Sequence, residues 1–145
     1  MAVKPTPVIQ DIANFFLSLP EPKCQEIEIL HRHILALLPN EKLWFDKGVN
    51  SEGKVVTNPT IGYGSQTITY ANGSSKEFFI LGLSANATGI SIYLLGLTDK
   101  TYLTQIIAPK IGKAKVTGYC IRLKKTSDIH LHVLEEAIAH RFQQK

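Results

Sequence analysis

Residues 59–123 read as a succession of short apolar segments separated by glycine and asparagine, and this pattern constrains the fold more than any other feature. In the segment 90–97, Ile90, Ile92 and Leu94 alternate with Tyr93, which is typical of a β-strand whose two faces meet different surroundings. Turn residues between such segments predict hairpins, and consecutive hairpins build a mainly antiparallel sheet. We therefore expect a sheet of about five to six strands.

The turn residues also set where the strands begin and end. Asn72-Gly73 predicts a two-residue hairpin loop of type I′, and Asn86–Gly89 predicts a second turn. The alternation changes parity between Tyr63 and Ile68, so a bulge or a break is expected at Gly64-Ser65. We predict strands over residues 43–45, from 60 onward, 77–85, 90–97 and 116–123, with 54–56 able to pair back onto the first.

Amphipathic segments on both sides of the strand region predict helices. Pro20 and Pro39 end the first two, and Pro109 with Gly112 is expected to close the third. We predict these helices over residues 7–19, 21–38 and 99–107, followed by a last helix that Ser127 caps. The chain thus predicts one α+β domain over residues 1–145, a two-layer fold whose antiparallel sheet has its helices packed on one face.

The sheet face away from the helices is expected to lie open. Tyr93, Leu95 and Cys120 fall on it, with part of the Phe78-Phe79 pair. A half-apolar face of this kind is covered by a second layer of the chain, forms a homodimer contact or binds a ligand. Packing or dimerisation is favoured over a ligand pocket. Arg122 would lower the pKa of the Cys120 thiol, yet a strand cysteine is typically a small apolar packing residue.

Two segments resemble motifs of common active sites, but neither has the complete motif or the surrounding elements that the motif requires. Gly82–Asn86 approaches G-x-S-x-G, but it ends in asparagine and precedes a turn instead of a helix. Gly112–Ala114 resembles the end of a phosphate-binding loop without its first glycine and its hydroxyl. His31/His33 and His130/His132 stand two apart, so neither pair can share one ion from a regular helix, and solvation or capping is the favoured role. The sequence assigns no catalytic residue, metal ligand or cofactor.

Six basic residues occupy the sixteen positions from 110 to 125, and no acidic residue stands between Asp99 and Asp128. Such a segment could bind phosphates or an acidic partner, or form a solvated basic edge that discourages aggregation between sheets. Nucleic acid is disfavoured because no aromatic stacking motif joins the segment. The candidate anion-binding residues are Lys113, Lys115, Arg122, Lys124 and Lys125.

The sequence also predicts a cellular setting. Its beginning has no apolar core of a secretory signal, and no stretch approaches the roughly 18 apolar residues of a membrane helix. We therefore expect a cytoplasmic protein without a membrane partner, in which Cys24 and Cys120 are reduced thiols. The formal net charge of +4 adds a mild preference for anionic partners.

Several phrases of the chain resemble, in order and spacing, the YdhG-like family of small domains without an assigned activity. They are Phe16–Pro20, Ile34–Pro39, Asn58–Gly64, Gly82–Ser84, Ile90–Tyr93, Gly118–Ile121 and Asp128–Ile129. The resemblance covers nearly the whole chain and implies a frataxin-like fold. Some members are described as frataxin-like iron chaperones, so iron handling is an implied alternative. The first helix of this chain carries only Asp11 in place of an acidic ridge, and no metal ligands are carried over.

Together these observations favour a non-enzymatic, cytoplasmic binding domain. Its partner would be a protein or a small molecule on the open sheet face, and a homodimer through that face is one form of this hypothesis. The first alternative is a frataxin-like iron-handling protein. The second is anion or nucleic-acid binding through residues 110–125.

Overall fold

The computed structural model of the chain describes residues 7–46, 48, 52–54, 59–86 and 89–143. Six strands form the main sheet in the order β1-β2-β5-β6-β8-β7, and every neighbouring pair is antiparallel. The predicted antiparallel sheet is therefore confirmed. Its strands are β1 (Leu43–Asp46), β2 (Thr60–Tyr63), β5 (Leu81–Asn86), β6 (Gly89–Leu94), β7 (Lys115–Val116) and β8 (Cys120–Leu123).

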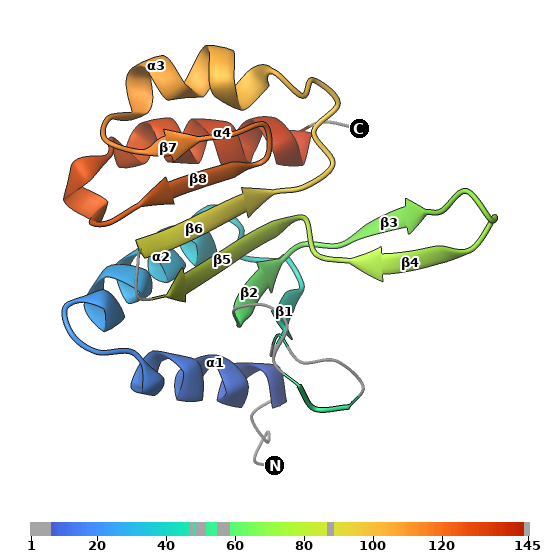
Figure 1. The fold of residues 1–145 in the computed structure, drawn as a ribbon, viewed down its shortest axis with the longest axis horizontal. Coiled ribbons are helices and arrows are strands. Elements are labelled where there is room, and N and C mark those ends of the chain that lie inside the picture. Colours follow the sequence, from blue (N-terminus) through green and yellow to red (C-terminus); the bar gives the residue numbers. More distant parts are fainter. Residues whose placement is uncertain (1–6, 47, 49–51, 55–58, 87–88, 144–145) are drawn as a thin grey trace.

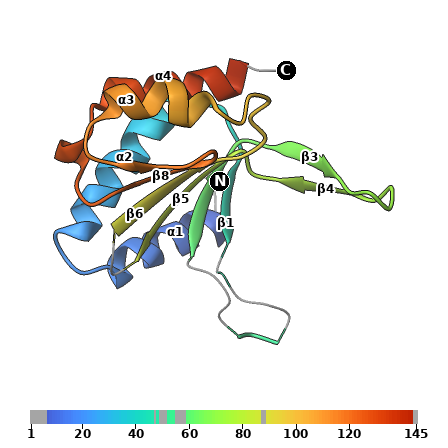
Figure 2. The same ribbon diagram turned by 45° about the horizontal axis from the view of Figure 1, so that its top comes forward.

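A second, two-stranded sheet projects from the main one as a hairpin (Figures 1 and 2). Its strands are β3 (Gln66–Thr69) and β4 (Ser75–Phe78), and both are largely exposed. The predicted break at Gly64-Ser65 is its cause, because Gly64 has φ +80° and turns the chain out of the main sheet. The strand predicted over 77–85 is divided for the same reason, since β4 and β5 belong to different sheets.

The helices lie along one face of the main sheet, as expected for this two-layer fold (Figures 1 and 2). Helices α1 and α2 come before the strands, and α4 comes after them. A π-helical turn, η1, leads directly into the short helix α3. The bounds are α1 (Pro7–Ser18), α2 (Lys23–Leu37), η1 (Leu103–Ile107), α3 (Ala108–Ile111), the 3-10 turn η2 (Thr126–Asp128) and α4 (Leu131–Gln143).

The core lies between the helices and the sheet face that they cover, where paired residues of neighbouring strands form rows across the sheet. In the central row, Phe45, Ile61, Leu83, Ile92 and Ile121 face one another across successive strands. The last four are fully buried against apolar helix residues. Each such side chain contributes about 1.5–3 kcal/mol through its removal from water. The period-two alternation that predicts the strands is thus the pattern that builds the core.

Local corrections concern turns and helix ends. The loop of the β3–β4 hairpin is not type I′, which requires φ above zero at both central residues. Only Gly73 has a positive φ there, the Gly73 N–H donates to the Tyr70 carbonyl, and the Tyr70 N–H donates to the Ser74 carbonyl. The loop is therefore a three-residue turn with a glycine bulge. Its Asn72 amide oxygen accepts from the Ser74 N–H at 3.0 Å.

The predicted strand 116–123 is wrong, because the chain folds back on itself within it. Strands β7 and β8 form a tight hairpin in which Val116 pairs with Ile121. The Thr117 N–H donates to the Cys120 carbonyl, and the Cys120 N–H donates to the Thr117 hydroxyl. Side chain and backbone together close a turn that the apolar alternation does not reveal.

Two helix boundaries also differ from the prediction. Pro109 does not end its helix, because it lies in the first turn of α3, where its fixed φ fits the helical conformation. The helix ends at Gly112, as predicted, and Gly112 has φ +109°. Ser127 does not cap α4, because it lies inside η2; the His130 carbonyl accepts from the Val133 and Leu134 N–H groups. Of the segment 54–56 that was predicted to pair with the first strand, residues 55 and 56 lie outside the described residues.

Candidate functional site

Five cationic side chains meet in one hollow at the β7 edge of the main sheet, where β8 ends and β6 and β7 begin (left side of Figure 1). Its volume is about 710 Å³. We call it the basic hollow, and its cationic lining is Lys113, Lys115, Arg122, Lys124 and Lys125. The structure thus brings together all five residues that the sequence suggested as anion ligands.

The turn around Gly112 explains why two stretches of the basic segment lie side by side. Gly112 pairs with Ile129 in an isolated bridge, and the Lys113 N–H donates to the Asp128 carbonyl at 2.8 Å. A Cβ atom at Gly112 would lie 2.5 Å from that carbonyl oxygen, so only glycine fits this approach. The backbone bridge therefore holds the start of β7 against the chain that follows β8.

Two of the cations are held opposite each other in the sheet. Lys115 on β7 is the direct partner of Arg122 on β8, and both are exposed. Like charges at directly opposed positions destabilise an antiparallel pair. The repulsion between these two side chains would be relieved by an anion placed between them.

The basic hollow keeps most of its charge uncompensated. Among the described residues, Lys113, Lys115, Lys124 and Lys125 form no ion pair. The acidic residue of the lining is Asp128. Lys110 belongs to the same basic segment, yet its ammonium group lies 2.6 Å from the Glu136 carboxylate and is not part of the lining. The positive potential is therefore concentrated in the hollow and not spread along the segment.

The outer face of the main sheet holds a smaller, mostly apolar hollow of about 430 Å³. Tyr93 and Leu95 line it together with Phe78 and Phe79. Cys120 does not line it; the side chain is buried beside Tyr93 in the sheet. Of the three residues predicted for this face, Tyr93 and Leu95 thus line the hollow, and Cys120 is buried. Burial raises the pKa of the Cys120 thiol and outweighs the opposite effect of Arg122.

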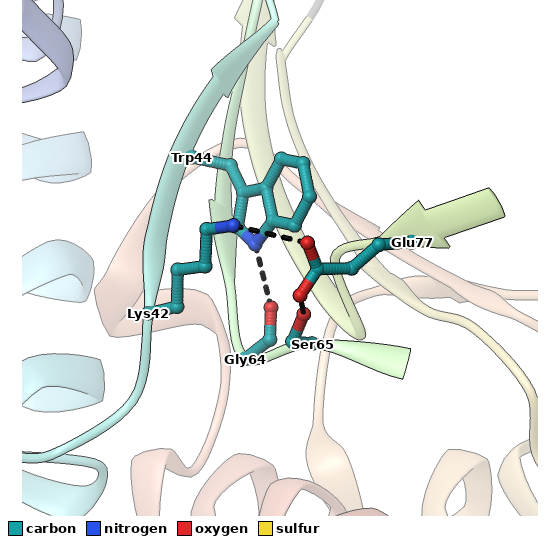
Figure 3. Close-up of polar contacts among 5 residues, drawn as sticks. All are labelled: Lys42, Trp44, Gly64, Ser65 and Glu77. Carbon is teal, nitrogen blue, oxygen red and sulfur yellow. Dashed lines mark hydrogen bonds and ion pairs between the residues drawn. The ribbon is translucent and has the colours of Figure 1, made fainter. Parts of the chain in front are cut away.

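Polar contacts tie the base of the β3–β4 hairpin to the chain around β1 and to the turn after β2 (Figure 3). The indole N–H of Trp44 donates to the Gly64 carbonyl at 2.7 Å, and the Lys42 ammonium lies 3.1 Å from the Glu77 carboxylate. The Ser65 hydroxyl donates to the other carboxylate oxygen. These contacts, first Ser65 and then Lys42, hold the pKa of Glu77 below its usual range. They fix the hairpin where Phe78 and Phe79 meet the sheet.

One histidine has a role that the sequence reasoning missed. His31 was expected to be solvated or capping, but its Nδ1 atom lies 2.6 Å from the Tyr63 hydroxyl, which is buried in the core. Burial lowers the pKa of His31 to about 4 and raises that of Tyr63. The neutral ring and the buried phenol thus share a hydrogen bond across the fold. The signal was present, because His31 lies on the same helical face as Ile27 and Ile34.

No group of three or more histidine, cysteine, aspartate or glutamate side chains among the described residues could hold a metal ion. Within the same part of the chain, no helix combines the length and apolarity needed to cross a membrane. No protein-family model matches the chain, and neither a curated protein nor a solved structure matches it. The resemblance to the YdhG-like family stays a prediction.

Proposed function

We propose that the protein is a binding domain for an anionic ligand, which it holds in the basic hollow. The observation that carries the proposal is the convergence of Lys113, Lys115, Arg122, Lys124 and Lys125 on one concave surface. Arginine and lysine are the side chains that proteins use for phosphate and carboxylate groups. A hollow of about 710 Å³ also lies within the size range of small-molecule sites.

Electrostatics favours an anion with more than one negative charge. Two opposite unit charges about 4 Å apart attract by roughly 1 kcal/mol in bulk water and by roughly 4 kcal/mol near a protein surface. Several such contacts are needed to offset the loss of translational and rotational freedom on binding. Five cations supply them, and Asp128 opposes them with one charge.

The proposed role is binding without a catalytic step. The described lining of the basic hollow contains no histidine, cysteine, serine or threonine that could act as a base or a nucleophile. Its ionisable groups are cations and a single carboxylate. The chemistry that these side chains offer is attraction and hydrogen-bond donation to an anion.

Isothermal titration calorimetry with pyrophosphate at low salt tests the proposal. We expect saturable binding that weakens as sodium chloride is raised, because salt screens the attraction between exposed charges and the screening length falls to about 10 Å at 0.1 M. The double variant Lys113→Gln/Lys115→Gln should lose tenfold or more in affinity. Lys76→Gln removes the same kind of charge from β4, outside the hollow, and should change affinity less than twofold. Equal losses in both variants would contradict a specific site.

A second candidate function keeps the outer face as the binding surface. The hollow there gathers the rings of Phe78, Phe79 and Tyr93 beside Leu95, which suits a small aromatic ligand. Titration with indole, followed by nuclear magnetic resonance, should then shift the signals of Tyr93 and Leu95 selectively. Unchanged signals at millimolar indole would exclude this candidate. Iron handling gains no supporting contact among the described residues, and a cytoplasmic homodimer stays a prediction.

A further inference from the structure

A second hollow adjoins the basic hollow and shares two of its lysines. This flanking hollow has a volume of about 360 Å³ and is lined by Pro22, Lys23, Glu26, Lys124 and Lys125. Lys124 and Lys125 therefore stand between the two hollows and line both. The start of α2, far away in the sequence, thereby brings a sixth cationic residue, Lys23, to the same surface.

A hydrogen bond across the fold holds the two hollows together. The Thr126 N–H donates to Oε2 of Glu26 at 2.6 Å, which ties the start of η2 to the first turn of α2. Because Thr126 directly follows the two shared lysines, this bond fixes the chain on which they stand. Glu26 is the acidic residue of the flanking lining, and three lysines outnumber it there.

The chemistry of the lining distinguishes phosphate groups from nucleobases. The described linings of the two hollows contain lysine, arginine, aliphatic and acidic residues, and no aromatic ring. Single-stranded nucleic acids gain much of their affinity from bases stacked on aromatic side chains. Further cations line each hollow on either side of Lys124 and Lys125. This arrangement suits a ligand whose negative charges follow one another along a short chain.

We propose that the ligand is a linear oligophosphate whose phosphate groups occupy both hollows and pass over Lys124 and Lys125. This inference rests on the proposed function and adds to it the class of ligand and the contribution of Lys23. A single phosphate would occupy the basic hollow alone. An oligophosphate would contact cations from α2 as well as from β7 and β8.

Calorimetry with two probes, orthophosphate and tripolyphosphate, tests this inference. Tripolyphosphate should bind at least tenfold more tightly than orthophosphate. Lys23→Gln should weaken tripolyphosphate about three- to tenfold, as expected for one charge contact that stays in contact with water and contributes about 1 kcal/mol. The same variant should leave orthophosphate affinity within twofold. Lys115→Gln should weaken both probes, because Lys115 lines the basic hollow. Lys76→Gln serves as the control for total charge.

Each contrary outcome has a separate meaning. Equal tripolyphosphate affinity in wild type and Lys23→Gln, with Lys115→Gln still weakened, would overturn the spanning ligand and leave the proposed function standing. Absence of binding for both probes would overturn both proposals. A thymidine oligonucleotide with the same number of phosphates that binds more tightly than tripolyphosphate would overturn this inference in favour of single-stranded nucleic acid. Lys76 and Lys115 are exposed and Lys23 is partly exposed, and matching melting curves would show that the variants fold alike.

Discussion

Gly62 and Gly82 are direct partners on adjacent strands, and the Phe79 ring lies over both of them on the outer face. A Cβ atom at Gly62 would lie 2.6 Å from Phe79 Cγ, and one at Gly82 would lie 2.9 Å from Phe79 Cε1. Both distances are too short for a real side chain. The two glycines thus let an aromatic ring from the strand connection close the centre of a face that the sequence predicts to be open.

The protonation of His31 likewise depends on the tertiary structure, which buries its ring beside Tyr63. The half-buried His31 ring stays neutral because burial disfavours the charged imidazolium and lowers its pKa. An unfolded chain would protonate this histidine near pH 6.5. The unfolded state therefore binds more protons than the folded state between about pH 6.5 and the folded pKa of about 4.

This difference predicts a loss of stability on acidification. The contribution of His31 is complete above pH 6.5 and is lost as the pH falls toward 4, because its folded pKa lies below its unfolded pKa. Urea unfolding should give a free energy about 1–2 kcal/mol smaller at pH 4.5 than at pH 7 from this residue, allowing for solvent screening of a partly exposed ring. Trp44 fluorescence reports the transition.

His31→Gln is the matched comparison, because its amide can still accept from Tyr63 and does not titrate. Its free energy of unfolding should fall less between the two pH values than that of wild type. The same fall in both proteins would assign the pH dependence to other groups.

At the scale of elements, the β3–β4 hairpin extends away from the main sheet (Figure 1). Its strands pair only with each other, and many of their side chains are exposed. At its base, Glu77 contacts Lys42 and Ser65. The Gln66 amide nitrogen donates to the Phe79 carbonyl at 3.2 Å, and the Gln66 amide oxygen accepts from the Arg141 guanidinium at 2.9 Å. Such an element opens locally more readily than core strands.

Glu77→Gln should therefore loosen the hairpin and leave the main sheet unchanged. We expect amide hydrogens of β3 and β4 to exchange about two- to fivefold faster, the range expected for one exposed ion pair. Exchange in β5 and β6 should stay the same. Lys76→Gln changes a charge on the same strand without touching the Lys42–Glu77 pair and should have a smaller effect. Faster exchange throughout the protein would mean that Glu77 stabilises the whole fold.

At the scale of the whole molecule, the end of β8 and the start of β7, which contribute to the basic hollow, lie on the opposite side of the fold from the β3–β4 hairpin (Figure 1). Several other cations are paired: Arg32 with Glu28, Lys42 with Glu77 and Lys110 with Glu136. The net charge of +4 is thus distributed unevenly, and the basic hollow carries the concentrated share. A ligand that binds there only in the folded state would stabilise the entire protein.

Pyrophosphate should therefore raise the melting temperature by more than sodium chloride at equal ionic strength. At a ligand concentration 100 times the dissociation constant, linkage gives about 2.7 kcal/mol, which corresponds to roughly 5–10 °C for a chain of this size. Differential scanning calorimetry measures the shift. Lys113→Gln/Lys115→Gln should melt with little dependence on pyrophosphate. A shift that sodium chloride reproduces in full would identify general screening as the cause.

Much of the fold follows from local patterns in the chain. The alternation in residues 90–94 predicts the face that β6 buries, and the parity change at Gly64-Ser65 predicts where the chain leaves the sheet. The turn inside 116–123 could not be predicted in this way, because a Thr117 hydroxyl bond closes it and the apolar alternation continues through it. The sequence does not show why glycine stands at positions 62 and 82, because the reason is the approach of the Phe79 ring in the folded protein.

The candidate site divides along the same line. The crowding of cations in residues 110–125 is visible in the sequence, since charge and spacing are local properties. Only the tertiary structure forms the hollow and places Lys115 opposite Arg122. It also pairs Lys110 with Glu136 and brings Lys23 of α2 close to Lys124 and Lys125. Strand register and the packing of distant elements set these contacts, and neither is encoded in the period or composition of a single segment.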